Sequence, residues 1–328
     1  MQHKLEITKK LEDLGVHLYR NDFVAVLNMP TANKCEKRAE QVEINGRTQQ
    51  ACRNCVTQGI PSGRRLSLQQ SVKIIDYFAG NYGTRFLTVN GRGDPFHPEL
   101  KAETLGKIKH AKGRGVQSYV FTAGNNLDEP TCDFLACNEV NVMISLYGNK
   151  FIGPEFFEGV VYPQSTGRLQ NQAKIAGNLR RLIGTYNSRK PEQGTRIGMN
   201  YVVLEEDLRD VERIRALQEA ANNNRVFFVC NTPFKPHPNP AVQEQLRYLA
   251  REFSDFHISH STGVNGQCQM GAGSSVTIDY DGTFYRCPYM SGRGDGNFLT
   301  LAELERRAVV KSYLSDRGWV CVMRGTRL

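Results

Sequence analysis

The stretch NMPTANKCEKRAEQVEINGRTQQACRNCVTQG (28–59) contains three of the chain's nine cysteines, namely Cys35, Cys52 and Cys55. It begins at the end of the apolar run FVAVLN (23–28), which is short and stops before Pro30, as buried β-strands do. The amphipathic segment LSLQQSVKIIDYFAGNYG (66–83) follows it and predicts a helix that begins near Ser67 and ends in glycine. The three cysteines therefore belong to the loop between the first strand and the first helix.

Sixteen residues separate Cys35 from Cys52, and they include Asn45-Gly46, a dipeptide that favours a tight hairpin turn. Such a hairpin would fold the insert back on itself and bring Cys35 towards Cys52 and Cys55, so that three thiolates face one site. A structural zinc site normally has four ligands, whereas an iron–sulfur cubane held by three cysteines keeps one iron open to another molecule.

The rest of the first 235 residues alternates between strand-like and helix-like segments. Strands are predicted at 85–91, 118–124, 140–148, 196–204 and 225–231, and helices around 99–112, 129–139, 168–186 and 205–222. Together with the first strand, these segments make six βα units and predict an α/β fold, a partial (βα)6 barrel with a parallel sheet. Functional residues are then expected at the carboxyl ends of the strands.

The pattern changes after about residue 262, in the stretch GQCQMGAGSSVTIDYDGTFYRCPYMSG (266–292). Val276, Ile278 and Tyr280 alternate before the turn signal Asp281-Gly282, which predicts a β-hairpin between two cysteines. We therefore expect an N-terminal helix over 1–22, the barrel over 23–235, and a helical connector with a small C-terminal hairpin cap over 236–328.

Composition and charge set the expected surroundings. No apolar run approaches the length that spans a membrane, and the first twenty residues lack the apolar core of a signal peptide, so a cytoplasmic protein with reduced cysteines is expected. The formal net charge of +9 either favours an anionic partner, such as a phosphorylated metabolite or a nucleotide, or serves only to keep the protein soluble.

With these features the sequence resembles the radical S-adenosylmethionine superfamily, whose members carry a three-cysteine loop, usually CxxxCxxC, after the first strand of a partial (βα)6 barrel. Cys52 and Cys55 match the CxxC half, and Cys35 precedes an expanded gap. The resemblance implies that these three cysteines hold a catalytic 4Fe–4S cluster. A cluster of this kind in the family binds S-adenosylmethionine at its open iron.

Three further segments resemble the family's cofactor-binding elements. NGRGDPF (90–96) is similar to the GGEP motif, which implies that the segment Arg92, Gly93, Asp94 and Pro95 meets the methionyl end of S-adenosylmethionine. Glycine there lets the backbone approach the cofactor closely, and Asp94 takes the place of the motif's glutamate. ISLYG (144–148) and GMNYVV (198–203) resemble two other elements and point to Ser145 and Asn200.

The tail resembles the SPASM or twitch extension, which holds an auxiliary iron–sulfur cluster. Cys268, Gly282 and Cys287 fit its Cx9–15Gx4C opening, and Cys321 is the one cysteine that follows, as in the shorter twitch type. The implied auxiliary ligands are therefore Cys268, Cys287 and Cys321, with Arg324 standing where a further cysteine would complete a CxxC. A zinc site of Cys52, Cys55, Cys268 and Cys287 is the alternative, but it leaves Cys35 and GRGDP unexplained.

Cys230 ends the predicted strand 225–231 and is directed by that position toward the mouth of the barrel. Three roles are open for it: packing, a fourth ligand to the auxiliary cluster, or a thiol that gives a hydrogen atom to a substrate radical. Cys132 and Cys137 are expected to pack as small apolar residues.

The resemblance implies an enzyme that forms a 5′-deoxyadenosyl radical and abstracts hydrogen from a small polar substrate, a sugar, cyclitol or nucleotide, in an epimerisation or dehydrogenation. Its partners would be that substrate, anionic if the charge is informative, and a reductant such as flavodoxin or ferredoxin. Radical modification of a peptide is the alternative reaction. A zinc-stabilised nucleic-acid-binding protein competes from another class, but the basic residues are spread along the chain and no recognition motif occurs.

Overall fold

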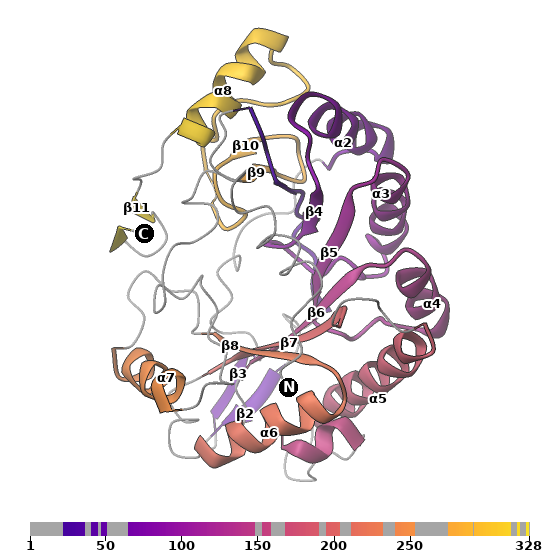
Figure 1. Ribbon diagram of the computed structural model, residues 1–328, viewed down its shortest axis with the longest axis vertical. Helices are drawn as coiled ribbons and strands as arrows, with labels where there is room; N and C mark the ends of the chain where they lie inside the picture. The colour runs from indigo at the N-terminus through magenta and orange to yellow at the C-terminus, as the bar shows by residue number, and fades with distance from the viewer. Residues whose placement is uncertain are drawn as a thin grey trace.

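The computed structural model describes residues 22–36, 41–44, 47–50, 65–147, 153–158, 168–189, 195–203, 211–231, 240–252, 275–290, 292–315, 320–321 and 326–327. Within this part of the chain, eight strands form one sheet in the order β10-β9-β1-β4-β5-β6-β7-β8. The order ends at β10 and β8 without closing into a ring, so the sheet is an open, curved one (Figure 1).

Six neighbouring strands of this sheet are parallel and correspond to the six predicted strands. They are β1 (Val26–Asn28), β4 (Phe86–Val89), β5 (Gln117–Thr122), β6 (Asn141–Tyr147), β7 (Ile197–Val202) and β8 (Phe227–Asn231). The predicted α/β fold with a parallel sheet is confirmed. An open sheet of six parallel strands agrees with a partial barrel.

Helices connect the consecutive parallel strands and lie along the outer side of the sheet, as Figure 1 shows. They are α2 (Leu68–Tyr82), α3 (Lys101–Gly113), α4 (Glu129–Cys137), α5 (Arg168–Asn187) and α6 (Val211–Asn223), with a short 3-10 helix η2 (Pro154–Glu158) before α5. Each lies within or close to its predicted range. The structure describes no helix that is long and apolar enough to cross a bilayer.

The first of these helices shows how local sequence sets an element's ends. Ser67 caps α2 by accepting a hydrogen bond from the backbone N–H of Gln70, whose side chain accepts in return from the Ser67 N–H. Gly83 ends the helix in the left-handed conformation, with φ of 62°. Ile74, Ile75 and Phe78 on its inner face are buried against the sheet.

The C-terminal segment extends the barrel sheet. The predicted hairpin is present as β9 (Ser275–Ile278) and β10 (Phe284–Tyr285), which pair in an antiparallel manner around Gly282. β9 also pairs in parallel with β1, so that Thr277 is the register partner of Asn28. The remaining elements are α7 (Pro240–Glu252), which lies in the predicted connector, α8 (Glu303–Ser315), and the pair β11 (Val320–Cys321) and β12 (Thr326–Arg327).

The insert between Cys35 and Cys52 forms the hairpin that Asn45-Gly46 predicted. Its strands are β2 (Gln41–Ile44) and β3 (Arg47–Gln50), with Ile44 opposite Arg47 and Gln41 opposite Gln50. The predicted N-terminal helix falls on residues 1–22, of which 1–21 lie outside the described residues.

Both faces of the sheet are buried. Leu27, Leu87 and Val276 pack with α2 and α8 on the outer face. Side chains alternate along a strand, so their neighbours Val26 and Phe86 lie on the inner face, in a cluster with Met143 and Val229. This inner face lines the interior of the barrel, and its polar positions are the ones of interest for function.

Candidate functional site

Three loops meet at the carboxyl ends of β1, β4 and β9. β1 leads into the loop that carries Cys35, β4 leads into Asn90–Asp94, and β9 leads through the hairpin to Cys287. The strands are parallel neighbours, so their carboxyl ends lie at the same edge of the sheet. In the sheet, β1 lies between β9 and β4, so the Cys35 loop begins beside both the hairpin and the candidate cofactor loop.

The loop after β1 is held firmly up to its first cysteine. Residues 29–33 are buried, and Cys35 itself is partly buried. Thr31 donates a hydrogen bond from Oγ1 to the Arg92 carbonyl oxygen at 3.1 Å. This contact ties the cysteine loop to the loop after β4.

The hairpin β2–β3 shortens the path from Cys35 to the CxxC pair. Gln41 and Gln50 face each other at the open end of the hairpin. The shortest path from Cys35 to Cys52 therefore runs along residues 36–40, across this one pair of strands and through residue 51, and not along all sixteen residues. Cys52 and Cys55 lie outside the described residues, and the convergence of the three thiols stays a prediction.

The auxiliary site is described only in part. Cys287 is buried two residues after β10, and Cys321 belongs to β11, whereas Cys268 lies outside the described residues. In the described part of the chain, no three His, Cys, Asp or Glu side chains gather as a metal-binding group. The two ligand sets of the sequence analysis therefore remain predictions.

The loop Asn90–Asp94 packs tightly between the other two loops. Gly91 has φ of 114°, and a Cβ atom there would lie 2.6 Å from Cβ of Pro288, the residue after Cys287. Gly93 has φ of 54°, and a Cβ atom there would lie 2.2 Å from the carbonyl oxygen of Ala32. Glycine is required at both positions by the backbone angle and by the close approach of the neighbouring loops.

Asp94 fastens this loop to the end of β5. Its backbone N–H donates to the Lys34 carbonyl oxygen at 2.7 Å. Its buried carboxylate accepts hydrogen bonds from the backbone N–H groups of Phe96 (2.8 Å) and Ala123 (2.7 Å) and from the Thr122 hydroxyl (3.0 Å). Asp94 therefore fixes the conformation of the loop, a role that the resemblance to GGEP did not predict. Pro95 continues the same turn.

Arg92 points toward the C-terminal hairpin. Its guanidinium donates from Nε to Oδ1 of Asp279 at 2.8 Å, and its Nη2 lies 2.7 Å from Oδ2 of the same carboxylate. Both side chains are buried. Burial raises the pKa of the Asp279 carboxyl above its ordinary value, and the adjacent Arg92 charge opposes that rise.

Ser145 and Asn200, which two separate motif resemblances pointed to, lie side by side in the sheet. They are direct register partners on β6 and β7, and both are partly exposed. Met143, two residues before Ser145, belongs to the inner cluster, so alternation puts Ser145 and its partner on the inner face of the barrel. A hydroxyl and an amide there are suitable hydrogen-bonding groups for the polar parts of a cofactor.

Cys230 lies on the opposite face. It is fully buried in the outer cluster together with Tyr201, Phe228 and Leu246, whereas its neighbour Val229 lies in the inner cluster. The thiol is thus directed into the layer between sheet and helices, not toward the barrel interior. This geometry favours packing among the three roles considered from the sequence.

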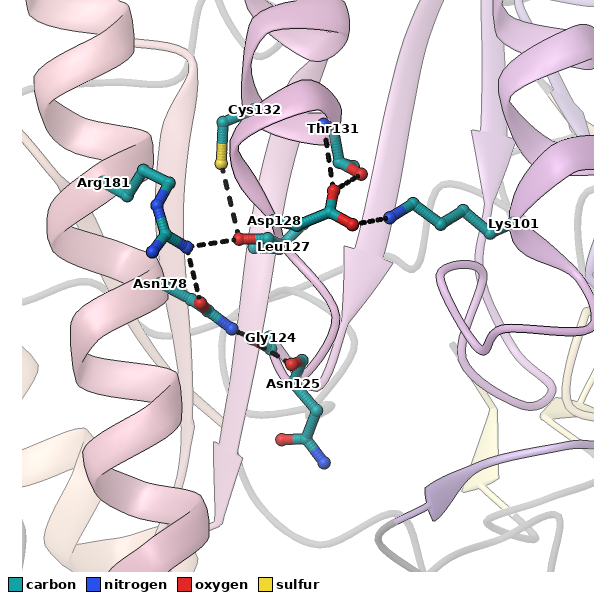
Figure 2. A network of polar contacts seen from close by, with 9 residues as sticks. All are labelled: Lys101, Gly124, Asn125, Leu127, Asp128, Thr131, Cys132, Asn178 and Arg181. Carbon is teal, nitrogen blue, oxygen red and sulfur yellow. Dashed lines mark hydrogen bonds and ion pairs between the residues drawn. The ribbon is translucent and has the colours of Figure 1, made fainter.

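A polar network holds the loop after β5, and sequence reasoning missed it (Figure 2). Asn178 of α5 donates from Nδ2 to the carbonyl oxygens of Gly124 (2.8 Å) and Asn125 (3.0 Å). Arg181, one turn later, donates to the carbonyl oxygen of Leu127 at 3.0 Å. The spacing of Asn178 and Arg181 on one face of a helix was the available signal, but it did not identify their partners.

Asp128 completes this network at the start of α4. Its carboxylate accepts from the Thr131 backbone N–H as an N-cap and pairs with the Lys101 ammonium at 2.6 Å (Figure 2). The Lys101 contact and the Thr131 hydroxyl lower the pKa of Asp128 to about 2. The loop between Thr122 and α4 is therefore fixed at both ends.

No protein-family model matches the chain, and no curated protein matches it. Several solved structures do match the chain. SuiB of Streptococcus suis bound to the precursor peptide SuiA has a TM-score of 0.60 at 12% identity, covering 95% of this chain and 71% of that one. SuiB bound to S-adenosylmethionine has a TM-score of 0.58 at 11% identity, covering 94% of this chain and 69% of that one.

A third structure is anSMEcpe with bound AdoMet and the Cp18Cys peptide, with a TM-score of 0.57 at 13% identity, covering 85% of this chain and 79% of that one. SuiB and anSMEcpe are radical S-adenosylmethionine enzymes. At these identities the similarity is one of fold. The chain thus has the fold of radical S-adenosylmethionine enzymes, as the resemblance in its sequence implied.

Proposed function

We propose that the chain is a radical S-adenosylmethionine enzyme. The observation that carries the proposal is the fastening of the Cys35 loop to the loop Asn90–Asp94, through Thr31 and through the Asp94 N–H, in a fold whose solved examples bind S-adenosylmethionine. When bound together, a reduced 4Fe–4S cluster and S-adenosylmethionine supply a 5′-deoxyadenosyl radical that abstracts hydrogen from an unactivated carbon.

The donor set of the chain fits these groups. Cys35, with Cys52 and Cys55, would hold the catalytic cluster by thiolates. The backbone of Arg92–Pro95 would meet the methionyl end of the cofactor, and Ser145 and Asn200 would orient it by hydrogen bonds from the inner face. The apolar inner residues Val26, Phe86, Met143 and Val229 exclude water from the space beside them.

For the tail we propose a second cluster with Cys268, Cys287 and Cys321 as ligands. The position of Cys287 supports this role, since the next residue, Pro288, lies against Gly91 in the loop that also packs against the Cys35 loop. A flavodoxin or ferredoxin is the proposed source of electrons.

The proposed substrate is a small polar molecule, a sugar, cyclitol or nucleotide, which undergoes epimerisation or dehydrogenation. The resemblance of Cys268, Gly282 and Cys287 to the twitch type supports this choice, because it implies a substrate of this class. A peptide is the second candidate, and the comparisons support it: SuiB and anSMEcpe are structures with peptides bound.

The function is tested by reconstituting the chain anaerobically, reducing it, and measuring 5′-deoxyadenosine formed from S-adenosylmethionine. A brown protein that forms 5′-deoxyadenosine supports the proposal, whereas a colourless zinc protein without cleavage refutes it. Candidate sugars, cyclitols, nucleotides and peptides are then compared by their stimulation of 5′-deoxyadenosine formation, which separates the two substrate classes.

A further inference from the structure

Arg92 lies in the loop after β4, and its side chain is buried although arginine is mostly exposed in proteins. Its guanidinium is buried, and it forms a two-point ion pair with Asp279, 187 positions later in the chain. Nη2 also donates to the Met290 carbonyl oxygen. The rings of Tyr280 and Tyr285 lie 5.9 and 6.0 Å from Cζ, close enough for cation–π attraction.

These partners all belong to the hairpin and to the segment just after Cys287. Asp279 and Tyr280 directly follow β9, Tyr285 ends β10 two residues before Cys287, and Met290 lies three residues after it. Two further contacts join the same segments: the Asn90 amide donates to the Tyr289 hydroxyl at 3.2 Å, and Gly91 lies against Pro288. The residues on both sides of Cys287 therefore contact Asn90–Arg92.

The same loop is fixed on its other side to the residues before Cys35. The Arg92 carbonyl oxygen accepts from Thr31, and Gly93 packs against Ala32. The loop Asn90–Asp94 thus contacts both the segment that leads to Cys35 and the segment around Cys287, whose strands β1 and β9 also pair directly. A buried Arg–carboxylate pair is well suited to hold the loop against the hairpin, because its two parallel hydrogen bonds fix both distance and orientation.

We propose that Arg92 is a positioning residue which, through Asp279, couples the binding of S-adenosylmethionine at the loop Asn90–Asp94 to the metal occupancy of Cys287. This inference rests on the proposed function. It assigns the Arg92 side chain to the hairpin, while the backbone of the loop faces the cofactor. Coupling between two sites is reciprocal, so the cofactor also favours the hairpin arrangement in which Cys287 is loaded.

The test is a double-mutant cycle on the reconstituted protein, read by equilibrium dialysis of S-adenosylmethionine. Cys287→Ser is expected to weaken binding about tenfold, within the range typical of coupled sites. Arg92→Met leaves the Asp279 carboxylate buried and unpaired, so Arg92→Met/Asp279→Leu is used as well, because it removes both charges together. In that double background, Cys287→Ser should change the dissociation constant by less than about twofold.

A second readout does not depend on the clusters. Hydrogen exchange of the metal-free chain should show faster exchange in both peptides 86–96 and 284–290 when Arg92 and Asp279 are replaced. Arg307→Met is the matched control, since Arg307 forms an Arg–carboxylate pair with Glu303 at 2.7 Å on the exposed side of α8. It should alter neither peptide and neither dissociation constant.

Each outcome decides one claim. A tenfold effect of Cys287→Ser that persists in the double background overturns the coupling through Arg92 and leaves the proposed function intact. The coupling also fails if Cys287→Ser does not change cofactor binding in the otherwise wild-type chain. Absence of S-adenosylmethionine binding to the wild-type chain overturns the proposed function itself.

Discussion

Gly93 lies directly against Ala32, so that a Cβ atom on Gly93 would come within 2.2 Å of the Ala32 carbonyl oxygen and within 2.8 Å of the Lys34 nitrogen. Both contacts are with backbone, which cannot move aside as a flexible side chain can. The contact joins the loop after β4 to the loop that carries Cys35. Even a methyl group at position 93 would therefore force the two loops apart.

We expect Gly93→Ala to weaken S-adenosylmethionine binding by at least tenfold and to lower the thermal midpoint, because the left-handed backbone and the backbone contact both disfavour a Cβ atom. Gly184→Ala is the matched control. Gly184 lies inside α5, and its added Cβ atom would meet nothing within 4 Å, so alanine there should stabilise by about 0.5–1 kcal/mol. Equal effects of the two substitutions would contradict the close-contact argument.

Cys35→Ala should abolish 5′-deoxyadenosine formation as fully as Cys55→Ala, since a cubane held by only three thiolates is no longer retained when one of them is removed. The measurement is 5′-deoxyadenosine formed per chain, with iron content determined on the same samples. Cys137→Ala serves as the control, because Cys137 is an exposed cysteine at the end of α4. Activity retained by Cys35→Ala would show that the sixteen-residue gap does not belong to the cluster loop.

Cys287→Ala should remove about half of the iron while leaving the Cys35 site loaded, if Cys268, Cys287 and Cys321 hold a cluster of their own. Iron and sulfide analysis of reconstituted protein measures this directly. One cluster per wild-type chain would exclude the auxiliary site.

Cys230→Ala should behave as a core substitution. Its thiol is fully buried among apolar residues of the outer cluster, and loss of one heavy atom there costs about 1 kcal/mol. We expect a lower urea midpoint with unchanged iron content and unchanged product, and Cys132→Ala, also fully buried, should show the same pattern. Loss of product with full iron would instead identify Cys230 as a hydrogen donor.

The sequence predicted the six parallel strands, their helices and both hairpins, because these depend on local signals. Ser67 and Gly83 end α2, and Asn45-Gly46 and Asp281-Gly282 turn the chain between short strands. The parallel pairing of β9 with β1 could not be predicted. It joins residues about 250 positions apart, and no local pattern encodes such a pairing.

The face of the sheet on which Cys230 lies could not be predicted from the sequence either. The strand Phe227–Asn231 is buried on both sides, so its apolar residues do not alternate with polar ones and periodicity gives no orientation. The Arg92–Asp279 pair was missed for a different reason: the motif resemblance concerned the backbone of the loop, whereas the Arg92 side chain binds Asp279, which follows β9 and lies 187 positions later in the chain.

The Asp128 carboxylate stabilises the folded chain both as the N-cap acceptor of α4 and as the ion-pair partner of Lys101, and a pH series can separate these two contributions. Its pKa is lowered to about 2 in the folded chain, below the value of about 3.9 for an unfolded aspartate, so its contribution is fully present above about pH 4 and is lost as the pH falls toward 2.

Asp128→Asn keeps an N-cap acceptor for Thr131 but loses the Lys101 ion pair, which solvent screens because more than half of the Asp128 side chain is exposed. We therefore expect Asp128→Asn to lower the urea midpoint only slightly at pH 7, and Asp128→Ala to lower stability by about 1 kcal/mol. The difference between wild type and Asp128→Asn should shrink between pH 7 and pH 3, and a difference that stays constant or grows over this range would show that Lys101 does not stabilise the ionised carboxylate.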